Sequence, residues 1–143
     1  KNPWSLTVVG VGPMAEKLKI AGVNMLGFVQ PDNLPEIFNA SSCMVVPSLY
    51  EPWGVQLSEG ATAGLPIIAT TECGAAVHLI RPNFNGYLIQ SNDVEMLVKS
   101  MILIELNPDL NEFSVNSSFL ASQFTPEAFA SNLLAHYVAD GSV

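Results

Sequence analysis

The sequence predicts an α/β fold: a Rossmann-like parallel sheet of about five strands flanked by helices. Two observations carry this prediction. Short apolar runs alternate with helix-like segments along the first two thirds of the chain, a pattern typical of βα repetition. Hydrophobic residues make up 49% of the 143 residues and charged residues only 13%, so the chain can bury a sizeable core. We expect a single domain over residues 1–143, without a repeat or an internal linker.

The predicted strands are short apolar segments bounded by glycine, proline and polar residues. The segment 43–46 is apolar on both sides, which predicts a central position in the sheet. The strands are expected at residues 6–9, 23–28, 43–46, 66–69 and 86–89.

The predicted helices are marked by capping residues and by apolar residues at helical spacing. Gly64 is expected to end one of them, Asn92 or Asp93 to cap another, and Thr125 to cap the last, in which Pro126 takes the first position. The apolar face of the helix at 93–106 is expected to contain Val94, Leu97, Val98, Met101 and Ile104. The helices are expected at residues 13–21, 34–41, 55–63, 93–106, 111–123 and from 126 onward.

Charge and composition exclude several classes of protein. The net charge of −8 argues against nucleic acid or an anionic membrane as the main partner. The apolar runs are too short to span a bilayer, and no cleavable apolar segment follows the first residues. Two cysteines, Cys43 and Cys73, form no disulfide framework, so we expect reduced thiols and a cytoplasmic location.

Open parallel sheets bind ligands beyond the carboxyl ends of their strands, so the loops at 10–13, 47–59 and 70–75 are the candidate sites. The first contains Gly10 and Gly12 in the G-x-G spacing of dinucleotide-binding proteins. The alternative interpretation is that these glycines only form a tight turn between the strand and the helix. The next strand ends without an acid that could hold a ribose, which argues against an NAD-dependent oxidoreductase. A phosphoacceptor receiver domain would need acids where the first strand ends at Gly10, and none is there.

The second loop contains two carboxylates, Glu51 and Glu59, eight positions apart. Pro52 and Gly54 place Glu51 in the loop and Glu59 inside the following helix. The start of that helix, near Gly54 and Val55, leaves backbone N–H groups free and carries the positive end of the helix dipole. This arrangement suits an elongated ligand with an anionic middle and hydroxylated ends. The alternative, two ordinary solvated glutamates, stays open at this stage.

The segment 47–70, PSLYEPWGVQLSEGATAGLPIIAT, resembles the donor-site signature of retaining GT-B glycosyltransferases of the family-four or group-1 type. Glu51 and Glu59 match the two glutamates of the pattern P-S-x-x-E-x-x-G-x-x-x-x-E-A-x-A-x-G-x-P-V-I-A-T, and Gly60 departs from the usual alanine. Other family segments are G-x-G-P, L-G-x-V, G-G-x-x-E-x-I and N-G-x-L. They resemble residues 10–13, 26–29, 73–80 and 85–88, so that the resemblance covers nearly the whole chain.

The resemblance implies a lobe that binds a nucleotide-diphosphate sugar for retaining glycosyl transfer of a hexose type, in bacterial polysaccharide or glycoconjugate synthesis. It implies that Glu51 contacts the donor sugar as the catalytic residue and that Glu59 holds the ribose. Neither a metal nor another cofactor is expected, and no His, Cys, Asp or Glu cluster has metal-ligand spacing. The other donor-binding residues would be Trp53, Gly54, Val55, Gln56, Gly10, Gly12 and Val29.

Two features depart from the family. The chain starts at what would be the second strand of the lobe, so the first strand and its two diphosphate-binding cations are absent. The five basic residues match none of those positions, which predicts weak donor binding. We also expect an acceptor glycan or lipid, and any membrane association, to depend on an N-terminal lobe that this chain lacks, so that the chain alone should not transfer sugars. A non-catalytic nucleotide-binding or interaction module of the same fold is the alternative.

The missing strand would lie between the strands at 6–9 and 43–46. We expect these two strands to pair directly, or the gap to be filled in a strand-swapped dimer, because unpaired buried backbone groups are costly. His78 stands where the family usually has Glu; it is either a titratable group at the cleft or an ordinary helix-face residue. Trp53 either packs against a sugar or covers the start of the helix.

Overall fold

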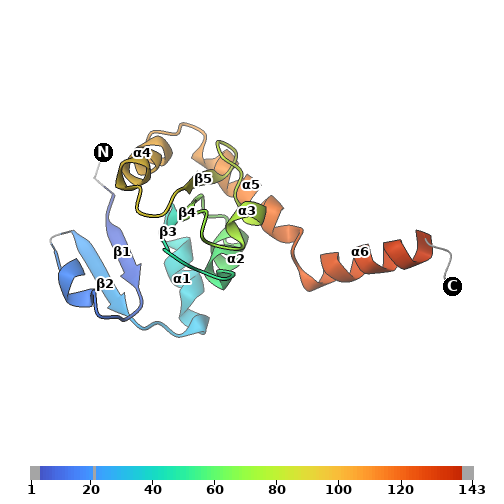
Figure 1. Cartoon of the computed structure of the whole chain (residues 1–143), viewed down its shortest axis with the longest axis horizontal. Coiled ribbons are helices and arrows are strands. Elements are labelled where there is room, and N and C mark those ends of the chain that lie inside the picture. The colour runs from blue at the N-terminus through green and yellow to red at the C-terminus, as the bar shows by residue number, and fades with distance from the viewer. Residues whose placement is uncertain (1–3, 21, 140–143) are drawn as a thin grey trace. The chain divides into compact units, whose positions relative to one another are not determined.

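The computed structural model describes residues 4–20 and 22–139, without the side chains of residues 129, 132 and 136–139. The chain forms two compact units, Lys1–Ile37 and Phe38–Val143. All five predicted strands form, parallel and accompanied by helices, which confirms the α/β class (Figure 1).

The first unit contains a two-stranded parallel sheet. Strand β1 (Leu6–Val9) pairs with β2 (Val23–Gly27). The helix predicted at 13–21 is a short 3-10 helix at Ala15–Leu18, and Ala21 lies outside the described residues. That prediction of a longer helix is wrong because the segment has no buried residue and therefore no core against which a helix could pack.

The second unit contains a three-stranded parallel sheet in the order β3-β4-β5. Its strands are β3 (Met44–Val46), β4 (Ile67–Thr70) and β5 (Gly86–Ile89). Every residue of β4 is buried, whereas β3 lies at an edge of this sheet. The predicted central position of residues 43–46 is therefore wrong: their apolar character comes from covering helices on both faces, and β4 takes the centre.

The expected single sheet of five strands is also corrected. The described strands form two separate ladders, β1-β2 in the first unit and β3-β4-β5 in the second. Strands form where local apolar patterns favour them, but their order depends on contacts between distant segments, which the pattern does not encode. Exchange of a strand with a second chain stays a prediction.

Helices cover both faces of the three-stranded sheet. On one face, helices α2 (Val55–Thr62), α3 (Ala76–Leu79) and α5 (Leu110–Ser122) pack together. Ile67 and Ala69 of β4 point into this core, and Ile68 points to the opposite face, as the alternation of a strand requires. On that opposite face, Ile68 packs in one cluster with Ile104 of α4 (Val94–Glu105). Helices α1 (Leu34–Asn39) and α6 (Pro126–Ala139), with a 3-10 helix at Pro31–Asn33, complete the described elements.

Several helix ends match the predictions. The side chain of Asp93 accepts a hydrogen bond from Met96 N–H (2.9 Å), and Thr125 Oγ1 accepts one from Ala128 N–H (3.1 Å). After α2, the N–H of Gly64, at φ +76°, donates to Ala61, and the N–H of Leu65 donates to Gly60. These two bonds form a Schellman motif, for which a left-handed glycine is well suited.

The apolar face predicted for residues 93–106 is only partly correct. Leu97, Met101 and Ile104 pack into the core, but Val94 and Val98 are exposed by 68% and 50%. No helix among the described residues is both long and apolar enough to cross a membrane.

Candidate functional site

The loops that follow β3 and β4 are bonded to one another beyond the carboxyl ends of the strands. Gly74 N–H donates to the Glu51 carbonyl at 3.0 Å, and Ala75 N–H donates to the Trp53 carbonyl at 2.8 Å. At the base of the two loops, Thr70 Oγ1 donates to the Ser48 carbonyl at 2.6 Å. Two of the three loops predicted to hold the site thus form one structure.

Glu51 is half-buried in this structure, and its carboxylate faces the start of α2. One carboxylate oxygen accepts a hydrogen bond from Trp53 N–H, and the other accepts one from Gln56 Nε2, each at 3.4 Å. Both bonds are long, so Glu51 keeps most of its capacity to accept shorter hydrogen bonds from a ligand.

Gly54 begins α2 in a conformation that only glycine adopts easily, with φ +92° and ψ 63°. A Cβ at this position would lie 3.2 Å from Glu51 Cγ and 3.2 Å from Leu57 Cδ1, so glycine also lets the helix start lie close to the glutamate. No side chain caps α2. Within the described part of the chain, the N–H groups of Val55 and Gln56 make no hydrogen bond, which leaves two donors at the positive end of the helix dipole.

Glu59 is exposed on α2, one turn after Val55. The buried face of the same helix carries Leu57, Gly60 and Ala61. Glu59 therefore lies on the face that begins with Val55 and Gln56, away from the core.

An aromatic group lies next to the Glu51 loop. The Trp53 and His78 rings have centroids 6.2 Å apart, and the His78 and Phe124 rings have centroids 5.8 Å apart. Trp53 and Phe124 are each half exposed, at 50%. His78 thus lies on α3 between two aromatic side chains. Phe124 could not be identified from the sequence, because no local pattern relates it to His78 and Trp53, which lie 46 and 71 positions earlier.

Gly10, Gly12 and Val29 belong to the first unit. Gly10 has φ +124° and donates its N–H to the Gly27 carbonyl at 2.7 Å, and the Gly12 carbonyl accepts a bond from Ala15 N–H at 3.0 Å. The glycine segment therefore forms the tight turn that was one of its two interpretations. Val29 follows β2 and is half-buried.

Basic side chains are few in the second unit, which contains only Arg81 and Lys99. Arg81 precedes β5, at the amino end of the strand, and its guanidinium carbon lies 6.0 Å from the centroid of the Phe84 ring. Lys99 lies on α4. In the described part of the chain, no three His, Cys, Asp or Glu side chains gather closely enough to hold a metal ion.

The chemical character of this site follows from its parts. Uncapped backbone donors at a helix start favour an anion such as a phosphate. A half-buried carboxylate on one side, and an exposed carboxylate about one turn along the helix, are groups that can accept hydrogen bonds from hydroxyls. The fold and this site together define a Rossmann-like α/β protein whose candidate site lies beyond the carboxyl ends of its strands.

The family profile described as glycosyl transferases group 1 matches residues 1–117, and the chain belongs to this family. This match confirms the predicted group-1 glycosyltransferase family.

Individual relatives agree with the family. The UDP-Gal:alpha-D-GlcNAc-diphosphoundecaprenol alpha-1,3-galactosyltransferase of Escherichia coli is 31% identical over 85 residues, which cover 59% of this chain and 22% of that protein. The structure of sucrose-phosphate synthase from Thermosynechococcus elongatus matches with a TM-score of 0.77 at 24% identity, over 96% of this chain and 39% of that one. HepE of Anabaena, in complex with UDP and glucose, matches with a TM-score of 0.73 at 19% identity, over 95% and 40% of the two chains.

The two structural matches show a shared fold, that of GT-B glycosyltransferases. The chain spans about a third or less of the length of the curated relatives that it matches.

Proposed function

We propose that this chain is the donor-binding lobe of a retaining, hexosyl-type glycosyltransferase that uses a nucleotide-diphosphate sugar. The class of donor is supported by the Escherichia coli relative, which is named for UDP-galactose, and by HepE, which was crystallised with UDP and glucose. We place the activity in bacterial polysaccharide or glycoconjugate synthesis in the cytoplasm. The acceptor glycan or lipid, and any contact with a membrane, would be bound by a second lobe of the full-length enzyme.

One observation carries the proposal: the start of α2, without a side-chain cap, lies against the carboxylate of Glu51. The N–H groups of Val55 and Gln56 would bind the diphosphate. Glu51 would accept hydrogen bonds from the sugar hydroxyls, and Glu59, farther along the same helix, would accept those of the ribose. Trp53 would cover the sugar side of the site.

In the reaction, the bond between the sugar carbon and the diphosphate oxygen would break while the acceptor hydroxyl attacks from the same face and gives its proton to the departing diphosphate oxygen. Negative charge grows on the departing diphosphate, where the fixed amides of α2 would stabilise it without reorganising. Positive charge grows on the sugar ring, near the carboxylate of Glu51. The amides supply roughly 0.3–2 kcal/mol without a cation, so we expect weak binding of the donor by this chain alone.

Calorimetric titration with UDP, GDP and ADP tests the proposal. We expect one of these nucleotides to bind, and Glu59→Ala to weaken that binding about 10- to 100-fold, because a hydrogen bond to a charged acceptor contributes about 1.5–3 kcal/mol. Glu112→Ala, which removes an exposed glutamate from α5, is the matched control and should bind like the wild type. Equal affinities of the two variants would contradict the assigned role of Glu59.

The scarcity of basic residues near the site favours a second candidate, a non-catalytic interaction module of the same fold. That candidate predicts that none of the three nucleotides binds. The titration therefore separates the two functions.

A further inference from the structure

A cavity lies at the opposite end of the three-stranded sheet from Glu51. It has a volume of about 470 Å³, within the size range of small-molecule sites. Ser42, which comes just before β3, and Leu65, which comes just before β4, belong to its wall. Because both strands are parallel, this wall marks their amino ends, whereas the Glu51 loop follows their carboxyl ends.

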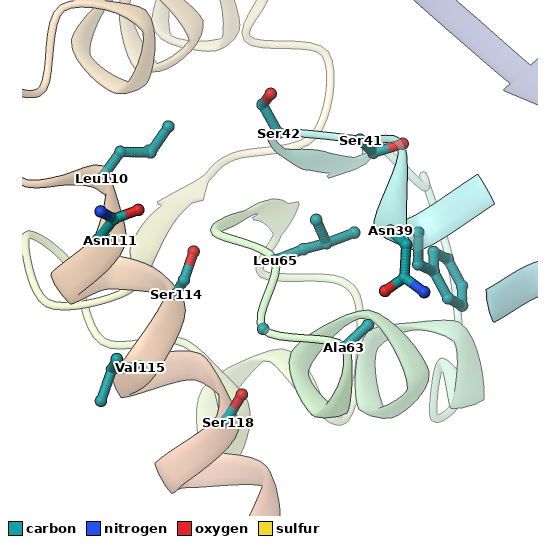
Figure 2. Close-up of a pocket in the computed structure, with 12 residues that line it drawn as sticks. Asn39, Ser41, Ser42, Ala63, Leu65, Leu110, Asn111, Ser114, Val115 and Ser118 are labelled. Atoms are coloured by element: carbon teal, nitrogen blue, oxygen red, sulfur yellow. The ribbon is translucent and has the colours of Figure 1, made fainter. Parts of the chain in front are cut away.

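The wall is polar but carries no ionisable side chain. Asn111, Ser114 and Ser118 come from one face of α5, at positions i, i+3 and i+7. Asn39 and Ser42 come from the end of α1 and from the loop after it. Figure 2 shows these polar side chains distributed around Leu65.

Much of this polar surface is available to a ligand. In the part of the chain that the structure describes, the side chains of Asn39, Ser42, Asn111, Ser114 and Ser118 make no hydrogen bond. Serine hydroxyls and asparagine amides both donate and accept, as do the hydroxyls of a sugar. The apolar part of the wall includes the Phe38 ring, which suits the C–H face of a sugar ring.

Gly64, which belongs to the wall of the cavity, lies close to α5. Gly64 at the end of α2 has φ +76°, and a Cβ there would lie 3.2 Å from Ser118 Oγ and 3.4 Å from the Ser114 carbonyl oxygen. A side chain at position 64 would therefore crowd the hydroxyl-bearing face of α5.

We propose that this cavity binds a neutral saccharide, as a site separate from the one proposed for the nucleotide sugar. The absence of basic side chains from the wall, in a chain of net charge −8, disfavours nucleotides and other anions. Paired donors and acceptors beside apolar surface favour an uncharged ligand with many hydroxyls. The saccharide hydrogen-bonds to Asn111 and Ser114, with Phe38 against its ring.

Amide NMR of the whole chain tests this site, with glucose, galactose, N-acetylglucosamine and maltose as probes and inorganic phosphate as the anionic comparison. We expect at least one sugar to shift the Ser42, Gly64 and Ser114 amides in a saturable way, and phosphate not to. Asn111→Ala should weaken that binding about fivefold, since it removes one neutral hydrogen-bonding group. Val115→Trp, at an exposed position of the wall, should abolish it.

Gln123→Ala, which truncates an exposed amide at the end of α5, is the matched control and should bind like the wild type. Thermal unfolding of each variant verifies that it is folded. Absence of saturable shifts at these amides with all four sugars would overturn the proposal, as would equal affinity of Asn111→Ala and Gln123→Ala. Binding of UDP near Gly54 is measured in the same sample, so failure of this site and failure of the donor site give different results.

Discussion

Gly74 N–H donates to the carbonyl oxygen of Glu51 at 3.0 Å, and the two residues connect the loop after β4 to the loop after β3. The N–H of Glu51 in turn donates to the Glu72 carbonyl at 3.1 Å. A Cβ at Gly74 would overlap the carbonyl oxygen of Pro52. The position of Glu51 therefore depends on a glycine that lies 23 residues later in the chain.

Gly74→Ala should separate the two loops and lower the free energy of unfolding by roughly 1–3 kcal/mol, because backbone must move to make room. Urea unfolding measures the loss. Gly12→Ala is the control, since nothing lies within 4 Å of a Cβ at Gly12, and it should change stability little. Unfolding midpoints that fall equally in both variants would show that the contact with Pro52 has no special role.

Asn85, the asparagine of the N-G-x-L segment, has a structural role that leads to a second prediction. Asn85 is fully buried; its amide donates to the Leu79 carbonyl (2.8 Å) and to Ser117 Oγ (3.2 Å), and its oxygen accepts a bond from Arg81 N–H (2.8 Å). Asn85→Ala leaves these groups without partners and should cost roughly 2–4 kcal/mol. Asn116→Ala, which removes one bond to the Phe84 carbonyl, should cost about 1 kcal/mol in the same urea measurement. The reverse order would refute the assignment of Asn85 as the centre of this network.

Burial raises the pKa of the Cys43 thiol from its ordinary value of 9.0 to about 12. Above pH 9 the unfolded chain releases this proton while the folded chain retains it, so the contribution of Cys43 to stability is lost as pH rises from 9 to 12. The stability difference between the wild type and Cys43→Ala should therefore shrink over this range. Urea unfolding at pH 8, 9.5 and 11 measures it, and a constant difference would contradict the pKa assignment.

The ring of His78 lies between two aromatic rings at distances typical of stabilising aromatic pairs. His78→Ala should reduce the free energy of unfolding by about 1 kcal/mol, and His78→Phe should restore most of it because a flat ring is kept. The fluorescence of Trp53 should change in the alanine variant. Equal loss of stability in both variants would mean that the ring contacts do not contribute.

The sequence predicted the features that depend on neighbouring residues. The caps at Asp93 and Thr125, the turn at Gly64 and all five strands were identifiable because glycine, proline and short polar side chains act locally. The family was identifiable because its signature lies in one continuous segment, which also placed Glu51 and Glu59 in one loop-helix element.

Features that depend on distant segments could not be predicted. The edge position of β3 follows from the division into two sheets, which apolar patterns do not encode. The contact of His78 with Trp53 and Phe124 brings together three segments of the chain. The cavity at the amino ends of β3 and β4 is formed by segments that lie up to 80 residues apart, from Phe38 to Ser118. Such surfaces emerge only when the helices are packed.

The central claim is that the amides at the start of α2 bind the diphosphate of a nucleotide donor. Amide NMR of the whole chain during titration with UDP tests it most directly. We predict that the largest saturable shifts occur at Gly54, Val55 and Gln56. Binding of UDP that shifts only amides elsewhere, such as those of the cavity around Ser114, would contradict the claim.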